Sequence, residues 1–281
     1  MPHFPQPIPF MKLTDYEKKA LREIDKWHGG GSTLVQQVMD WAMMPVDWAV
    51  NQFVPENLLT ESDGLITKGL EVLNDASQWT YTEHSILERA QKSEIRIEKI
   101  EDLQEQPLEK LDELARSYFD ENALLAAIQG GGMSLGGPVL LLADVPLLFT
   151  INFRLIQQIG ACYGFSMRGD QFTPLVLSIY NVASSGGQTA KKDALREVSV
   201  AAAAFANEMS YKGRKGANFQ DQNRHLPREI AKNLIGAKLG QMIPLAGIAI
   251  GAGVNYWFTS QTALTTFMLF RQLYIERKER M

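Results

Sequence analysis

The chain has 281 residues, 45% hydrophobic and 21% charged, which is enough apolar material for one large domain or two small ones. The single cysteine, Cys162, excludes an intrachain disulfide, and the four histidines stand in no zinc-ligand spacing, so neither a metal nor another cofactor is expected. No secretory signal is recognised at the N-terminus, which predicts a reducing, cytoplasmic setting.

The net charge of −4 conceals two halves of opposite sign. Residues 1–150 carry 12 Lys and Arg against 24 Asp and Glu, a charge of −12, whereas residues 151–281 carry 16 against 8, a charge of +8. Either the halves attract each other within the fold, or the basic half offers a surface to phospholipid headgroups. Nucleic acid is not expected, because the basic residues are not interleaved with aromatic residues and no binding motif occurs.

The first 121 residues predict a flexible leader and an acidic layer of helices. The leader, residues 1–11, has proline at alternate positions, which favours an extended chain. The first helix is predicted over residues 13–27, because Thr14 and Glu17 have the spacing of a capping box. Apolar periodicity and helix-starting prolines predict further helices at residues 34–53, 55–79 and 107–129.

Two apolar segments interrupted by glycine follow, at residues 122–165 and 233–271. In the first, the glycines at 130–132 and 136–137 predict a turn, after which a helix reaches Tyr163. In the second, glycines recur every four residues on one helix face, as in a glycine zipper, and let another backbone approach closely. The candidate close-packing positions are Gly236, Gly240, Gly247 and Gly251. We therefore expect two Gly-rich apolar helical hairpins.

Between these segments, helices are predicted at residues 173–184 and 191–211, followed by a basic loop at 211–216. Its cations are candidate contacts with an anionic membrane surface or a membrane-protein partner. Together with two arginines that follow, the candidates are Lys212, Arg214, Lys215, Arg224 and Arg228.

Four polar side chains within the apolar segments are candidate buried polar groups: Asp144, Arg154, Gln157 and Asn255. Asp144 stands among leucines, where a charged carboxylate cannot be buried without a partner. Two roles remain open for it. It is either the N-cap of a helix beginning near Pro146, or a buried polar switch or ion site.

Neither apolar segment has the roughly 20 uncharged apolar residues that a membrane-spanning helix needs. Residues 137–151 are interrupted by Asp144, and residues 242–254 are flanked by polar side chains. Such lengths favour a buried core helix or reversible insertion into a bilayer over a permanent span.

Several strings in the chain resemble the EcsC protein family. They are residues 142–148 (LADVPLL), 154–164 (RLIQQIGACYG), 243–247 (IPLAG) with Gly251 and Asn255, 13–17 (LTDYE) and 44–48 (MPVDW). The resemblance runs from about residue 12 to 275. The family takes its name from a protein encoded beside an ABC exporter in Bacillus-type bacteria, and the resemblance implies a fold rather than a reaction. A similar run of Pro, Asp, apolar residues, Gln and Tyr-Gly in helical modules of bacterial membrane proteins partnered with GTPases implies a membrane-proximal role.

These patterns predict one all-α domain over residues 12–281. An acidic helical layer, residues 12–121, would surround a half that is Gly-rich and basic, residues 122–281. The expected function is that of a non-enzymatic bacterial cytoplasmic protein, peripheral at the inner face of the cell membrane on lipid or a membrane-protein partner, and accessory to transport or secretion. A hydrolase whose site is not located and a hydrophobic-ligand binder are the alternatives; the nucleophile-elbow pattern Gly-x-Ser-x-Gly is absent from the sequence.

Overall fold

The computed structural model describes residues 13–29, 81–134, 138–168, 172–184 and 247–280. All regular structure within these ranges is helical, so the predicted all-α class is confirmed. The helices are α1 (Asp15–His28), α5 (Glu83–Lys92), α6 (Leu108–Ser134), α7 (Pro138–Cys162), α8 (Thr173–Ser184) and α11 (Gly247–Arg280), with a 3₁₀ helix, η2 (Ile100–Glu105). The leader at 1–11 and the helices predicted at 34–53, 55–79 and 191–211 lie outside the described residues.

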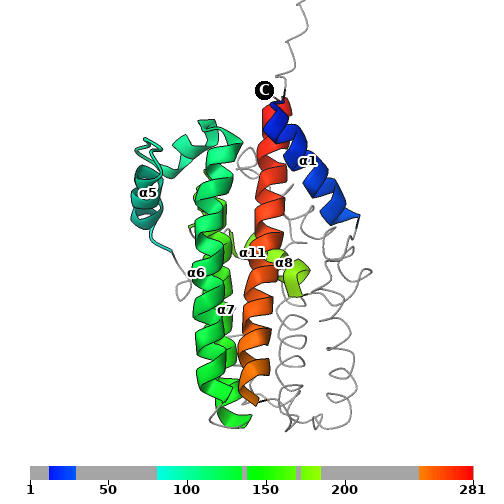
Figure 1. Ribbon diagram of the computed structural model, residues 1–281. Helices are drawn as coiled ribbons and strands as arrows, with labels where there is room; N and C mark the ends of the chain where they lie inside the picture. Colours follow the sequence, from blue (N-terminus) through cyan, green and yellow to red (C-terminus); the bar gives the residue numbers. More distant parts are fainter. Residues whose placement is uncertain (1–12, 30–80, 135–137, 169–171, 185–246, 281) are drawn as a thin grey trace, which may run out of the picture.

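Three long helices, α6, α7 and α11, form a bundle that organises the molecule (Figure 1). α6 and α7 run in opposite directions, and α11 packs along α6 with further contacts to α7 and α8. The C-terminal end of α6 and the N-terminal ends of α7 and α11 therefore lie at one end of the bundle. α1 and the C-terminal end of α11 lie at the other end.

α1 begins at the predicted capping box. The Glu17 N–H donates to Thr14 Oγ1 at 3.2 Å, and the Thr14 N–H donates to Glu17 Oε2 at 2.7 Å. This reciprocal pair satisfies N–H groups that the first helical turn leaves without a partner. Ala20 and Ile24 are buried, because residues four apart share a helix face, and this face packs against α11 and α6.

The predicted turn at residues 130–132 is wrong, because these glycines lie within α6, which continues to Ser134. Glycine costs about 1 kcal/mol in a helix interior, and packing of α6 on α7 and α11 outweighs that cost. The connection falls at residues 135–137, and Pro138 takes the first position of α7, where its missing N–H is harmless.

α7 includes both Asp144 and Pro146, so the helix does not begin near Pro146 and the N-cap role predicted for Asp144 is wrong. The predicted end near Tyr163 agrees with the observed end at Cys162. Gly164 follows with a left-handed φ of 83°, and the Phe165 N–H returns to the Gly160 carbonyl at 3.1 Å. A glycine is suited to this closure of a helix end.

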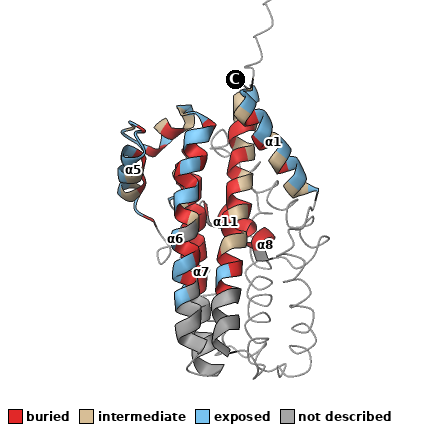
Figure 2. Cartoon of the chain, in the orientation of Figure 1, coloured by how far each residue is buried: buried red, intermediate tan, exposed pale blue. Residues whose placement is uncertain are grey.

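Buried residues follow the faces along which the long helices meet (Figure 2), and many of them are aromatic. The ring of Tyr180 on α8 packs edge-on against Phe149 and Phe153 of α7, at centroid distances of 5.6 and 5.1 Å. Tyr163 stacks with Phe270 of α11 at 6.2 Å. These contacts between distant parts of the chain hold α7, α8 and α11 together.

The second predicted hairpin is described only from Gly247, where the chain forms one helix, α11, through to Arg280. Gly247 and Gly251 belong to the first turns of that helix, whereas Gly236 and Gly240 lie outside the described residues. A close helix approach does occur at Gly160. A Cβ atom added there would lie 2.8 Å from both Met167 Cγ and Phe270 Cζ.

Candidate functional site

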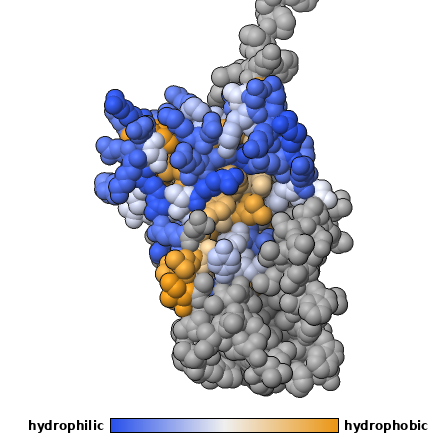
Figure 3. All heavy atoms as spheres, viewed as in Figure 1, coloured by the Kyte–Doolittle hydropathy of each residue, from blue (hydrophilic) through white to orange (hydrophobic). Residues whose placement is uncertain are grey.

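Four large apolar side chains are exposed on the described parts of α6 and α7 that lie toward the connection of these two helices. On α6, Leu124, Leu125 and Ile128 are 60%, 51% and 65% exposed, and on α7 Leu147 is 46% exposed. We call these four residues the apolar end. An orange patch toward this end of the molecule contrasts with the blue surface around α1 and α5 (Figure 3). Single exposed leucines are common, whereas several on the same part of a helix pair are typical of a contact surface.

Charged residues are scarce toward this end of each long helix. Between residues 122 and 153, Asp144 is the single charged residue, and α11 has none from Gly247 through residue 270. Tyr256 of α11 is 51% exposed and adds an amphipathic aromatic side chain. The charged residues of the three helices therefore concentrate away from the apolar end.

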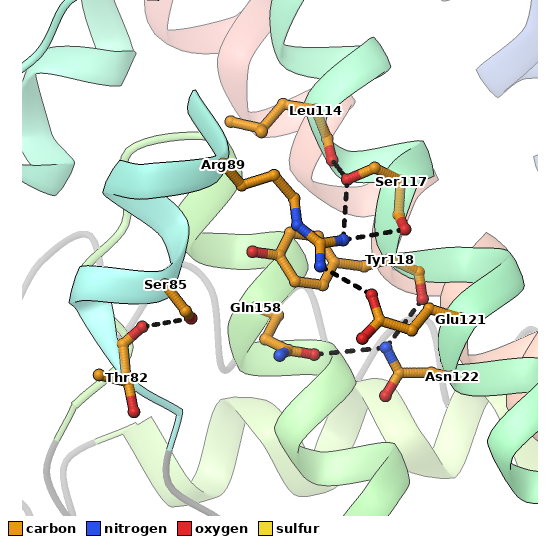
Figure 4. A network of polar contacts seen from close by, with 9 residues as sticks. All are labelled: Thr82, Ser85, Arg89, Leu114, Ser117, Tyr118, Glu121, Asn122 and Gln158. Atoms are coloured by element: carbon orange, nitrogen blue, oxygen red, sulfur yellow. Dashed lines mark hydrogen bonds and ion pairs between the residues drawn. The ribbon is translucent and has the colours of Figure 1, made fainter. Parts of the chain in front are cut away.

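A layer of polar contacts borders the apolar end and ties α5 and α7 to α6 (Figure 4). The Arg89 guanidinium lies over the Tyr118 ring, 4.0 Å from its centroid, and donates to Glu121 Oε2 at 2.7 Å. The Asn122 amide donates to the Tyr118 carbonyl at 2.8 Å and to Gln158 Oε1 at 3.4 Å. We call Arg89, Tyr118, Glu121, Asn122 and Gln158 the polar belt.

The opposite end contains a buried charge cluster that sequence reasoning missed. Arg271 of α11 and Asp112 of α6 are 2% and 1% exposed, and Arg271 Nε lies 2.9 Å from Asp112 Oδ2. The Nε–H is not aligned with that oxygen, so this contact is an ion pair without a hydrogen bond. A guanidinium nitrogen of Arg271 also donates to Glu23 Oε2 of α1 at 2.8 Å.

Two tyrosines complete the shell of Asp112. The Tyr163 hydroxyl donates to Oδ1 at 2.6 Å, and the Tyr16 hydroxyl donates to Oδ2 at 2.8 Å. Burial raises the pKa of Asp112, and Arg271 and both hydroxyls oppose this shift. Burial and the bond to Asp112 raise the pKa of Tyr16 to about 12, so this phenol stays a donor at neutral pH. The cluster joins α1, α6, α11 and Tyr163, the residue that follows α7, which is a structural task.

A surface groove of 550 Å³ lies beside α5 and η2. Its lining includes Glu88, Arg96, Glu98 and Glu105, and contains no Ser, Thr or Cys that could act as a nucleophile. Cys162 is fully buried, and burial raises the pKa of its thiol, which makes it a poor nucleophile. Within the described residues, no three His, Cys, Asp or Glu side chains are grouped so that they could hold a metal.

Of the four polar residues predicted to be buried, two are buried and one is exposed. Gln157 is buried and its amide donates to the Met167 carbonyl at 3.0 Å, and Asn255 is also buried. Arg154 is exposed, so its predicted burial is wrong. The reason is its position seven residues after the exposed Leu147, two turns along the same helix face. Asp144 lies within α7, and its side chain is outside what the structure describes.

The basic residues predicted to contact a membrane surface or a partner lie outside the described residues. They are Lys212, Arg214, Lys215, Arg224 and Arg228. Among the helices of the described ranges, none combines the length and the hydrophobicity of a membrane span.

Comparison with known proteins identifies a family and relatives to which this chain is similar. The model of the EcsC protein family matches residues 18–275. The uncharacterized protein YdbA of Bacillus subtilis (strain 168) is 24% identical over 263 residues, which cover 90% of this chain and 91% of YdbA. Protein EcsC of the same organism is 26% identical over 163 residues, 58% of this chain and 63% of that protein. No solved structure matches. The family match covers most of the chain, and the chain therefore belongs to the EcsC protein family.

Proposed function

We propose that this protein is a non-enzymatic bacterial protein that associates peripherally with the cytoplasmic face of the cell membrane. The observation that carries the proposal is the apolar end, Leu124, Leu125, Ile128 and Leu147, on a bundle whose charges gather at its other end. Transfer of such side chains from water into lipid is favourable, by about 1.5–3 kcal/mol for a fully exposed Leu or Ile. A role accessory to transport or secretion at that membrane is part of the proposal.

The sequence supports attraction to anionic lipid as a second contribution. Residues 151–281 carry a net charge of +8, and a Lys or Arg near an anionic membrane contributes about 1 kcal/mol. Arg154 is exposed on the same face of α7 as Leu147, which supports a contact with headgroups when the apolar end meets lipid. Membrane association then combines an apolar contact with a weaker electrostatic one, as in other peripheral proteins.

Flotation of the purified protein with liposomes tests the proposal. The protein is expected to float with liposomes that contain phosphatidylglycerol, and to float less with phosphatidylcholine alone or at high salt, since exposed charges are screened over about 8 Å at physiological ionic strength. Replacing Lys212, Arg214 and Lys215 by Glu should also reduce binding to anionic liposomes.

A pair of matched variants isolates the apolar end. Leu125→Gln with Ile128→Gln removes apolar surface worth roughly 1 kcal/mol per residue, because about half of each side chain is exposed, so binding should weaken by about 30-fold. Lys110→Gln with Glu113→Gln changes two exposed residues near the start of the same helix without changing the net charge, and should bind like the wild type. Equal binding by both double variants, or no flotation at low salt, would overturn the proposal.

A further inference from the structure

We propose that the groove beside α5 and η2 is a docking site for an extended segment of a partner protein in which basic and apolar side chains alternate. The groove is built by three stretches that follow one another in the chain: α5, the connection at residues 93–99, and η2. They lie beside α6, on the side away from α1 (Figure 1). Its lining includes none of the four residues of the apolar end, so the inference is independent of membrane association.

The connection between α5 and η2 has the residue pattern of a strand. It follows a turn in which Glu94 has a left-handed φ of 59°. Beyond that turn, Ile95 is buried and Ile97 half-buried, whereas Arg96 and Glu98 are exposed. Such alternation with a period of two is typical of an extended chain, because its successive side chains lie on opposite faces. The stretch therefore has one apolar face toward the core and one polar face toward water.

The backbone of this stretch has unused hydrogen-bonding groups. The Ile95 N–H donates to the Ala90 carbonyl at 2.9 Å, and the Glu98 N–H donates to a side-chain carboxylate of η2 at 3.0 Å. Between these two bonds, the N–H and carbonyl groups of Arg96 and Ile97 have no hydrogen-bond partner in the part of the chain that the structure describes. Unpaired backbone groups along one edge are what a second extended chain binds when it adds as a strand.

The charge of the groove indicates which chain would bind there. Its described lining includes four carboxylates and one guanidinium, from Glu88, Glu98, Asp102, Glu105 and Arg96. Hydrogen bonds from the N–H groups of Glu98 and Lys99 hold the Asp102 carboxylate and lower its pKa, and Glu88 lies 3.1 Å from His84. The carboxylates of Glu98 and Glu105 are both exposed, so a lysine or arginine of the occupant can reach them.

Apolar side chains supply the second component of recognition. Leu87 of α5 lines the groove together with Ile95 and Ile97, and orange atoms appear among blue ones in the region of α5 (Figure 3). Leu87 and Ile97 are only half-buried, so each retains surface that an apolar side chain can cover. In a paired strand, an apolar residue of the occupant would lie next to Ile97 and a basic residue next to Glu98, on the opposite face.

Selection from a phage-displayed library of random heptapeptides tests the site without assuming a sequence. The target is the purified full-length protein. Recovered peptides are expected to be enriched in Lys and Arg alternating with Val, Ile, Leu or Phe. Recovery of no peptide above background, or of peptides without an excess of basic residues, would overturn the proposal.

Matched double variants locate the binding of the best recovered peptide, which is labelled and followed by fluorescence anisotropy. Glu98→Gln with Glu105→Gln removes two carboxylates of the groove and should raise Kd about tenfold, within the range for two exposed ion pairs. Glu109→Gln with Glu113→Gln removes two exposed carboxylates of α6 outside the groove and should leave Kd unchanged. Far-UV circular dichroism checks that both variants fold. Equal weakening by the two variants would show general attraction to an acidic surface and would contradict a site in the groove.

N-methylation of the same peptide tests the strand pairing without changing the protein. In an extended chain the N–H groups of alternate residues point to the same side, so one alternate set faces the groove edge and the other faces away. Methylation of one set should raise Kd about tenfold or more, the effect of losing two hydrogen bonds, and methylation of the other set should change it little. Equal effects of the two sets would overturn docking by strand addition.

Discussion

Arg271 occupies an unusual place for an arginine, because it is almost fully buried and faces two carboxylates from different helices. Its cost of burial is offset by the ion pair with Asp112 and the hydrogen bond to Glu23. Its guanidinium also lies over the Phe267 ring, 4.7 Å from the centroid, which adds a cation–π contact. A lysine could not replace these contacts, because it lacks the planar fork of donors.

Arg271→Met is therefore expected to be strongly destabilising. It leaves the Asp112 carboxylate buried without its cation, which costs about 3–5 kcal/mol of unfolding free energy. Adding Asp112→Asn should recover part of this loss, because the amide carries no charge, its oxygen accepts from one tyrosine hydroxyl and its NH2 group can donate to the oxygen of the other. Urea unfolding of the wild type, the single variant and the double variant measures both effects. A double variant less stable than Arg271→Met would contradict a buried, unpaired charge as the cause.

Sequence reasoning chose Asp144 and Arg154 as buried polar residues and missed Asp112 and Arg271. The missed pair is 159 residues apart, so no local spacing connects its members. A signal was present at Asp112, which lies four residues after the buried Leu108 and three before the buried Ala115, on the apolar face of α6. The partner of Asp112, Arg271 of α11, could be identified only from the folded structure.

At the scale of elements, local signals predicted helix ends well and glycine runs poorly. The capping box of α1 and the limits of α8 at 173–184 were predicted from the chain, because caps and prolines act over a few residues. The glycines at 130–132 read as a turn, yet they continue α6. Their outcome depends on packing against α7 and α11, which no local pattern contains.

The end of α7 gives a sharp test of a glycine that the fold requires. Gly164 has a φ of 83°, which costs an L-residue about 1–2 kcal/mol, and a Cβ atom there would lie 2.7 Å from the Gln104 backbone nitrogen. Gly164→Ala should lower the unfolding free energy by about 2–3 kcal/mol in total, with overpacking added to the strain. Gly164 also accepts a hydrogen bond from the Gln104 amide at 2.6 Å, so any shift of the turn disturbs η2.

Gly29→Ala is the matched control at the end of α1. Gly29 has a φ of −66°, which any L-residue adopts, so the variant should lose less stability than Gly164→Ala. Thermal or urea unfolding of the two variants compares them directly. A similar loss in both would show that the left-handed backbone at Gly164 is not what makes glycine necessary.

For the whole molecule, the opposite charges of the two halves meet inside the fold. Glu17 pairs with Lys278 at 2.6 Å, Glu23 with Arg271 at 2.8 Å, and Glu83 with Arg168 at 3.6 Å. Each pair joins an acid from residues 1–150 to a base from residues 151–281. One of the two interpretations of the charge asymmetry, attraction between the halves, is therefore realised at these contacts. An additional role of the basic half at a membrane belongs to the proposed function.

The contact between Glu17 and Lys278 brings the two ends of the described chain together and predicts a dependence of stability on pH. Burial acts to raise the pKa of Glu17, but the hydrogen bonds from Lys278 and from Thr14 outweigh it and hold this pKa below its ordinary value. A carboxyl whose pKa is lowered by folding contributes stability above its unfolded pKa, about 4.3 for Glu, and loses that contribution as the pH falls through the folded pKa.

Glu17→Gln tests this linkage, because glutamine keeps an acceptor for the Thr14 N–H and loses the charge that pairs with Lys278. At pH 7 the variant should be less stable than the wild type by about 1–2 kcal/mol, the range for a hydrogen bond to a charged group. Toward pH 3 the difference should shrink, since the wild-type carboxyl becomes protonated as well. Glu113→Gln, at an exposed position on α6, should show little difference at either pH. Urea midpoints at the two pH values decide the outcome, and a Glu17→Gln deficit that persists or grows in acid would mean that packing, rather than the charge of Glu17, stabilises the junction of α1 with α11.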